Sequence, residues 1–258
     1  MPGTPRLGRT SPAAGTMRPP SARPARSIGA VCGRFVQTRE AENYGAYFSV
    51  DVIKTDEVLR SWNVAPTKQV YAVAEHDEQR QMGTFSWGLV PFWAKDRKIG
   101  ARLINARIET LAEKPAFRDS LAARRCIIPA DGFYEWEPKA RGKLPHYFYD
   151  PQRHPLALAG LWSSWSDPET GERLRTCTIV TRDASPDVAP IHDRMPVILP
   201  ESVWDAWLDV TTADTGAVRD LVAAVAAPDL QQHAVSTLVN RVANDLPELI
   251  APLESGAV

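Results

Sequence analysis

Residues 126–136 read CIIPADGFYEW, and residues 156–165 read LALAGLWSSW. Both stretches are dominated by apolar and aromatic residues interrupted by Gly, Pro, Asp or Ser, a pattern that favours β-strands separated by turns. The pairs Asp167-Pro168 and Thr170-Gly171 mark a hairpin turn after the second stretch. Further short runs of this kind occupy residues 146–149, 176–181 and 196–199. The second half of the chain is therefore expected to be rich in strands.

The first half of the chain contributes a hairpin and a loop. Residues 69–75 and 82–90 have strand character and are joined by a charged turn at 76–81. Residues 62–67 (WNVAPT) are expected to form a loop, because Pro66 interrupts regular structure. A last strand is expected at 232–237, and the tail after it is irregular.

Helical character is found in four segments. Thr38 is the expected N-cap of a helix at 38–48, and Pro115 is expected to interrupt or restart a helical stretch at 108–125. Two more helices are expected at 201–209 and 214–226. Because no internal repeat and no Gly/Ser linker divides the chain, residues 31–258 are predicted to form a single α+β domain. Its mixed or antiparallel sheet is expected to curl into a barrel-like shape with flanking helices.

The composition excludes several classes of protein. The 258-residue chain has no apolar run of about 18 residues, so a membrane-spanning helix is not expected. Cys32, Cys126 and Cys177 are too few and too scattered for a disulfide framework or a zinc site. This favours a reducing cytosol and predicts no metal or cofactor. Since the formal net charge is −1, any affinity for DNA must come from a local basic patch.

Residues 1–30 are expected to lie outside the fold. They contain six prolines, five arginines and no Asp or Glu, and they lack the apolar periodicity of a folded segment. They have no apolar core of a secretory signal, and the prolines do not suit the amphipathic helix of a transit peptide. Another interpretation is an over-early start assignment, with Val31 as the true initiator. Without this segment, 25 Lys and Arg stand against 31 Asp and Glu, so the remaining chain is acidic.

Four polar residues lie in tight segments rich in Gly, Pro and Trp, and they are candidates for chemistry. They are Cys32 in CGRF, Asn105 in LINARIET, Glu135 in DGFYEW and His192 in HDRMP. A carboxyl group among aromatic rings has the raised pKa that a general acid needs, and a loop histidine beside an arginine can shuttle protons. Structural interpretations stand beside these: a small core thiol, a turn amide, an outward-facing carboxylate and a solvated histidine.

Seven segments, taken together, resemble one family. In chain order they are CGRF at 32–35, NVAPT at 63–67, WGLVPFWAKD at 87–96, NARIET at 105–110, CIIPADGFYEW at 126–136, IHDRMPVIL at 191–199 and HAVSTLVNRVANDLPELI at 233–250. The chain is similar in these segments to the SOS-response-associated peptidase (SRAP) family, over nearly all of residues 32–250. Several rare motifs in order are far more specific than one short pattern.

The resemblance implies the SRAP fold and a role in the response to DNA damage. Proteins of this family shield abasic sites in single-stranded DNA by a covalent DNA–protein cross-link. Their nucleophile is an N-terminal cysteine, which Cys32 matches. Val31 stands where the family has Met, so the mature chain is expected to begin at Cys32. The resemblance also implies a monomer that acts on DNA in the cytoplasm, associated with the nucleoid, and it leaves AP-lyase and autoproteolytic activities open.

An N-terminal cysteine suits this chemistry because it carries two nucleophiles on adjacent carbons. The α-amine has a pKa of about 8 and the thiol of about 8.5, so both are partly reactive at neutral pH. The amine condenses with the C1′ aldehyde of the opened abasic sugar to an imine. The thiol then adds to the imine carbon and closes a five-membered thiazolidine. An internal cysteine has an amide nitrogen instead and cannot close this ring.

The resemblance also gives roles to residues of this sequence. Glu135 is the implied general acid/base, and His192 is the implied proton shuttle in opening the sugar. Asn105 is implied to orient the Cys32 amine. Implied phosphate ligands are Arg34, Arg107 and Arg194. Implied wedge and stacking surfaces are Pro66, Trp87 and Trp93, although a tryptophan taken alone is more often a core residue.

Two other hypotheses stay open. A cysteine hydrolase, of the N-terminal-nucleophile type or built on Cys32 and His192, would need an oxyanion hole and a peptide groove. A non-catalytic single-strand binding module would need Arg34 and Arg194 but not Cys32. Heating the protein with abasic single-stranded DNA separates the three, because only a covalent cross-link gives a shifted band that survives heat.

Overall fold

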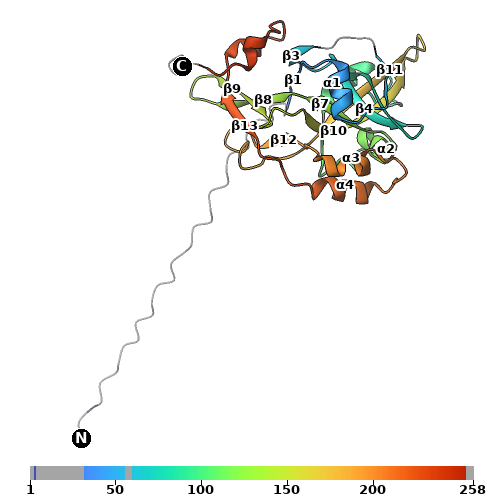
Figure 1. Ribbon diagram of the computed structural model, residues 1–258. Helices are drawn as coiled ribbons and strands as arrows, with labels where there is room; N and C mark the ends of the chain where they lie inside the picture. The colour runs from blue at the N-terminus through green and yellow to red at the C-terminus, as the bar shows by residue number, and fades with distance from the viewer. Residues whose placement is uncertain (1–2, 4–31, 56–59, 254–258) are drawn as a thin grey trace.

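The structure, a computed structural model, describes residue 3, residues 32–55 and residues 60–253. Apart from Gly3, the predicted extension at 1–30 and the proposed initiator Val31 lie outside these residues. The described chain forms two sheets with helices packed against them (Figure 1). Among these residues no helix is long and apolar enough to cross a membrane. The predicted α+β class is confirmed.

Five strands close into a barrel. In order around the ring they are β4 (Gln69–His76), β5 (Gln79–Trp87), β11 (Arg173–Asp183), β10 (Leu156–Ser166) and β7 (Arg125–Ala130). Neighbouring strands are antiparallel except β5 and β11, whose short parallel pairing closes the ring. Three short strands extend it: β2 (Val52–Ile53) on β5, and β6 (Asn105–Arg107) and β12 (Arg194–Pro196) on β11. This barrel is the curled, mixed sheet that the sequence predicted.

The second sheet is antiparallel throughout. Its strand order is β13 (Gln231–Ala234), β9 (Lys143–Tyr149), β8 (Gly132–Pro138), β1 (Phe35–Gln37) and β3 (Ser61–Val64). It brings the first described residues, the centre of the chain and the late strand side by side. As a result, two of the candidate residues meet at this sheet, because Cys32 precedes β1 and Glu135 lies on β8.

Both faces of the barrel strands are buried. Alternate residues of β4, such as Tyr71 and Val73, belong to a hydrophobic cluster shared with the helices α1 (Ala41–Tyr47), α2 (Pro115–Ala123), α3 (Glu201–Leu208) and α4 (Thr215–Ala223). Intervening residues, such as Val70 and Ala72, belong to a cluster shared with the second sheet. Strands covered on both faces read as continuous apolar runs, which explains the sequence of residues 126–130 and 156–161. Three short 3₁₀ segments complete the fold: η1 (Arg97–Arg102), η2 (Thr237–Asn240) and η3 (Pro247–Ile250).

The β-rich stretch 126–136 is divided between the two sheets. The chain leaves the barrel after Ala130 and enters the second sheet at Gly132. A Cβ atom at Gly132 would lie 2.4 Å from the carbonyl oxygen of Phe148 and 2.5 Å from the Tyr147 ring, so only glycine allows β8 to approach β9 here. This crossing delivers Glu135 to the second sheet.

Other local expectations are partly wrong. Thr38 does not cap a helix: its backbone N–H and hydroxyl both donate to the Asp131 carboxylate, and α1 starts three residues later. Within the expected loop at 62–67, residues up to Val64 form β3, because they pair with β1. Residues 108–114 form turns, and the helix begins at Pro115. The hairpin expected at 76–81 is confirmed, with a tighter turn at Asp77 and Glu78, which both have positive φ.

Candidate functional site

Cys32 and Glu135 form the centre of the site. Pairing of Phe35 with Phe133 aligns β1 with β8 and places Cys32 beside the middle of β8. The Cys32 backbone N–H donates to Glu135 Oε1 at 2.6 Å, and both residues are buried. Cys32 has φ +42°, a left-handed conformation that is uncommon for a residue with a side chain. The nitrogen that the sequence singles out as a nucleophile therefore lies against a carboxyl group.

The Glu135 carboxyl is held in its neutral form. Burial raises its pKa to about 8, and Asp193 adds to the increase, while the Cys32 N–H and Lys143 oppose it. Such a group carries a proton at neutral pH and can donate it. The environment thus gives Glu135 the property that a general acid requires.

His192 approaches the same carboxyl group from the loop between β11 and β12. Its Nε2 lies 3.9 Å from Glu135 Oε2, and its Nδ1 accepts a hydrogen bond of 3.1 Å from the Arg194 backbone N–H. Exposed Asp193 also lies 3.1 Å from Nδ1. The acceptor role of Nδ1 leaves the proton of a neutral ring on Nε2, facing Glu135. His192 therefore connects the buried carboxyl group to the surface.

The Cys32 thiol is not activated as a thiolate. Burial raises its pKa well above the ordinary value, and the nearby Glu135 raises it further. Cysteine hydrolases rely on a thiolate formed beside a histidine or a positive charge. The surroundings of Cys32 therefore lack the thiolate activation that a cysteine hydrolase needs.

Asn105 lies on β6, half-buried, in parallel register with Ile179 of β11. The preceding residue, Ile104, belongs to the same buried cluster as Cys32, and so does Ile191, which precedes His192. The four predicted catalytic residues thus come from four separate segments, three of which have neighbours or members in one hydrophobic cluster.

The predicted DNA ligands differ in how accessible they are. Arg34 is half-buried, with its guanidinium 5.9 Å from the Trp136 ring. Arg107 is exposed and Pro66 is half-buried. Trp93 is 48% exposed and stands beside Phe92, which is 54% exposed. Phe92 is not among the residues predicted from the sequence, although its position next to Trp93 in the PFW triplet is a usable signal.

Two predicted DNA ligands are occupied within the protein. Trp87 has no exposed surface: its ring packs edge-on against Phe35, and its Nε1 donates to Ile104 O at 2.9 Å. It has no free face on which a base could stack, and it is a core residue bonded to the residue before Asn105. Arg194 is also buried, and its guanidinium donates to Glu109 through both Nη atoms, at 2.7 and 3.0 Å. Asp183 and the Thr181 carbonyl take its other hydrogen bonds.

Residues 91–107 form a basic and aromatic segment. It carries a single acid, Asp96, and five cations: Lys95, Arg97, Lys98, Arg102 and Arg107. All five cations are exposed, as are Phe92 and Trp93. Exposed aromatic rings next to cations are typical of surfaces that bind single-stranded nucleic acid.

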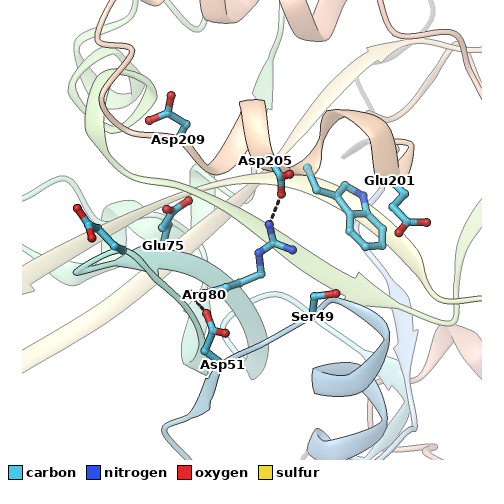
Figure 2. Close-up of a pocket in the computed structure, with 9 residues that line it drawn as sticks. Ser49, Asp51, Glu75, Arg80, Glu201, Asp205 and Asp209 are labelled. Carbon is cyan, nitrogen blue, oxygen red and sulfur yellow. Dashed lines mark hydrogen bonds and ion pairs between the residues drawn. The ribbon is translucent and has the colours of Figure 1, made fainter.

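A pocket of about 520 Å³ lies apart from the predicted site residues (Figure 2). Figure 2 shows Arg80 paired with Asp205 in it, surrounded by further acids. None of the predicted site residues lines it; its acids are Asp51, Glu75, Glu78, Glu201, Asp205 and Asp209. This negative wall would repel phosphate. Within the described part of the chain, no group of three or more His, Cys, Asp or Glu is arranged to hold a metal ion.

Comparison with known protein families identifies the family of this chain. Residues 31–242 match the family described as SOS response associated peptidase (SRAP). The chain belongs to the SRAP family. The matched range contains every predicted catalytic and DNA-binding residue, from Cys32 to Arg194.

Two bacterial proteins and one crystal structure illustrate the similarity. The chain is 41% identical over 224 residues to abasic site processing protein YoqW of Bacillus subtilis, covering 85% of this chain and 99% of that protein. It is 31% identical over 228 residues to abasic site processing protein YedK of Escherichia coli, covering 86% and 100%. A crystal structure of a protein from Bacteroides thetaiotaomicron shares the fold, with a TM-score of 0.77 at 24% identity over 86% of this chain and 100% of that chain.

Proposed function

We propose that this SRAP protein processes abasic sites in single-stranded DNA by forming a covalent thiazolidine cross-link through Cys32. The observation that carries the proposal is the 2.6 Å contact between the Cys32 nitrogen and the buried Glu135 carboxyl. The names of the SRAP relatives YoqW and YedK support the substrate. The protein acts as a monomer, in the cytoplasm at the nucleoid.

The reaction joins one sugar carbon to both nucleophiles of Cys32. The amine lone pair attacks C1′ of the ring-opened sugar, and loss of one water molecule gives the imine. The thiol sulfur then adds to the same carbon while its proton passes to the nitrogen. One C–N and one C–S bond form, the C=O bond is lost as water, and no oxidant is needed. The reaction requires a free Cys32 amine, so residues 1–31 must be absent from the active form.

Proton transfers at the sugar fall to Glu135 and His192. A neutral Glu135 donates a proton to the sugar oxygen as the ring opens and to the hydroxyl that leaves as water. His192, 3.9 Å away, returns the proton from the solvent side. Asn105 orients the sugar and the amine by hydrogen bonding. Holding both nucleophiles beside the aldehyde supplies the rate advantage of an intramolecular reaction.

The DNA backbone follows the exposed cations near the site. Arg34 and Arg107 bind phosphates, Pro66 separates neighbouring bases, and Trp93 with Phe92 offers rings on which bases stack. The net charge of +4 that the cations and Asp96 give to residues 91–107 supports this path in an otherwise acidic chain. Each phosphate contact contributes a salt-dependent part of the affinity.

The test uses a single-stranded oligonucleotide with one abasic site. Protein that starts at Cys32 should give a band that survives boiling, whereas protein that retains residues 1–31 should give none. Cys177→Ser, which removes a buried thiol of the barrel, is the matched control and should cross-link normally. A heat-stable band from uncleaved protein would refute the amine chemistry. DNA binding without any adduct would favour the binding module, and peptide cleavage without an adduct would favour the hydrolase.

A further inference from the structure

Asn63 is a buried amide that connects distant parts of the molecule. It lies on β3 and is 2% exposed. Its Oδ1 accepts a hydrogen bond of 2.6 Å from Arg34 Nη1. Its Nδ2 faces three carbonyl oxygens: Asn244 at 2.7 Å, Arg241 at 3.1 Å and Val239 at 3.2 Å. One side chain thus joins Arg34 to the C-terminal part of the chain.

The C-terminal strap, residues 235–250, is held against the second sheet at further points. The Trp62 backbone N–H donates to Asp245 Oδ1 at 2.6 Å, and Trp136 Nε1 donates to Asn240 Oδ1 at 2.7 Å. The strap also touches Arg34 directly, because the Val239 carbonyl accepts from Nη1 at 2.9 Å. Both hydrogens of Nη1 are therefore used inside the protein.

The opposite edge of the Arg34 guanidinium is unused. Its Nε is buried and has no hydrogen-bond partner, and no described residue accepts a hydrogen bond from its Nη2. A phosphate cannot reach Nε, because protein atoms cover it, but Nη2 is not covered in this way. Nη2 is therefore the donor left for an anion, and a charge-assisted hydrogen bond from it can hold one phosphate oxygen.

We propose that Asn63 is a positioning residue for DNA binding: it fixes Nη1 so that Nη2 of Arg34 faces a DNA phosphate, and it makes the C-terminal strap part of the binding apparatus. This inference rests on the Arg34–phosphate contact of the proposed function. Its strap extends to residue 250, beyond the range 31–242 that matches the family.

The test measures the affinity of folded protein for single-stranded DNA without an abasic site, at two salt concentrations. Arg34→Ala and Asn63→Ala should each weaken binding about tenfold, as expected for a lost charge-assisted hydrogen bond. The double variant should bind no more weakly than Arg34→Ala alone. Gln37→Ala is the matched control, because Gln37 is a 1% exposed amide on β1 that bonds only to backbone groups of other strands. It should destabilise the fold and keep the affinity.

Asn63→Asp provides a second variant that preserves the shape of the side chain. Its carboxylate keeps the acceptor for Arg34 but places a negative charge on it, so affinity should fall and the salt dependence should become shallower by about 0.7 in the log–log slope. A purely structural role would leave that slope unchanged.

Two results would overturn the inference. One is a loss of DNA affinity on Asn63→Ala that is as large in the Arg34→Ala protein as in the wild type. The other is normal DNA binding by both Asn63 variants while Arg34→Ala binds weakly. These differ from a failure of the proposed function. If Arg34→Ala itself binds normally, the phosphate contact fails and the positioning role fails with it. If cross-linking alone is absent, the covalent chemistry fails and the positioning role stands.

Discussion

Replacing Glu135 with Gln should flatten the dependence of protein stability on pH. In the folded protein the pKa of the Glu135 carboxyl is raised from its ordinary 4.5 to about 8, chiefly by burial. Between these two values the folded chain keeps a proton that the unfolded chain has released. The free energy of unfolding therefore falls as pH rises through this interval. At about 1.4 kcal/mol per pH unit, the total fall is about 5 kcal/mol, and Gln, which does not ionise, removes it.

Urea unfolding of both proteins between pH 5 and pH 9 measures this effect. The stability difference between Glu135→Gln and wild type should grow with pH and level off above about pH 8. Glu137→Gln on the same strand is the control: Lys139 lowers the pKa of Glu137, so its contribution is lost only as pH falls below the ordinary range. Parallel stability curves for wild type and Glu135→Gln would refute the reasoning, because the carboxyl would then titrate alike in both states.

Three further outcomes are expected. Cys32→Ser in protein that starts at residue 32 should lose the heat-stable adduct but keep an imine that borohydride traps, since the amine remains; absence of any trapped product contradicts this. Arg107→Ala should weaken DNA binding and leave the melting temperature unchanged. Arg194→Ala should instead lower the melting temperature by about 4 °C or more, because the buried Arg194 guanidinium makes several internal hydrogen bonds. Calorimetry and a binding titration on each variant check both outcomes. Gly132→Ala should cost at least about 2 kcal/mol in urea unfolding, because its Cβ would lie 2.4 Å from a backbone oxygen, and equal stability would contradict it.

Much of the fold could be predicted from local patterns. The hairpin around Asp77 and the helices near Glu201 and Thr215 follow from periodicity and turn residues, and the structure has them. The errors occur where distant residues decide the local conformation. Asp131 takes Thr38 away from capping a helix. Ser61–Val64 becomes a strand only because β1 lies beside it. No pattern within a short window contains such information.

The motifs indicated the candidate site residues, but they did not show which of these side chains are accessible and which are engaged within the protein. The structure brings Cys32 and His192 to the Glu135 carboxyl group, and the raised pKa of Glu135 follows from its apolar surroundings. The sequence could not show that Trp87 is wholly buried or that Arg194 is already bound to Glu109, because both depend on residues far along the chain. Nor could it show that Asn63 holds Arg34, since an asparagine in a short motif has no signature of its partners.

The parallel contact that closes the barrel also orders the events of folding. Trp87 of β5 pairs with Cys177 of β11, ninety residues later, whereas β4 with β5 and β10 with β11 are local hairpins. Local hairpins form first, and the long closure follows, because its entropy cost is met only when most of the chain is in place. Asn105 and His192 belong to segments attached to β11, while Cys32 and Glu135 belong to the other sheet. Contacts between these two pairs of residues are therefore complete only when both sheets have formed and packed together.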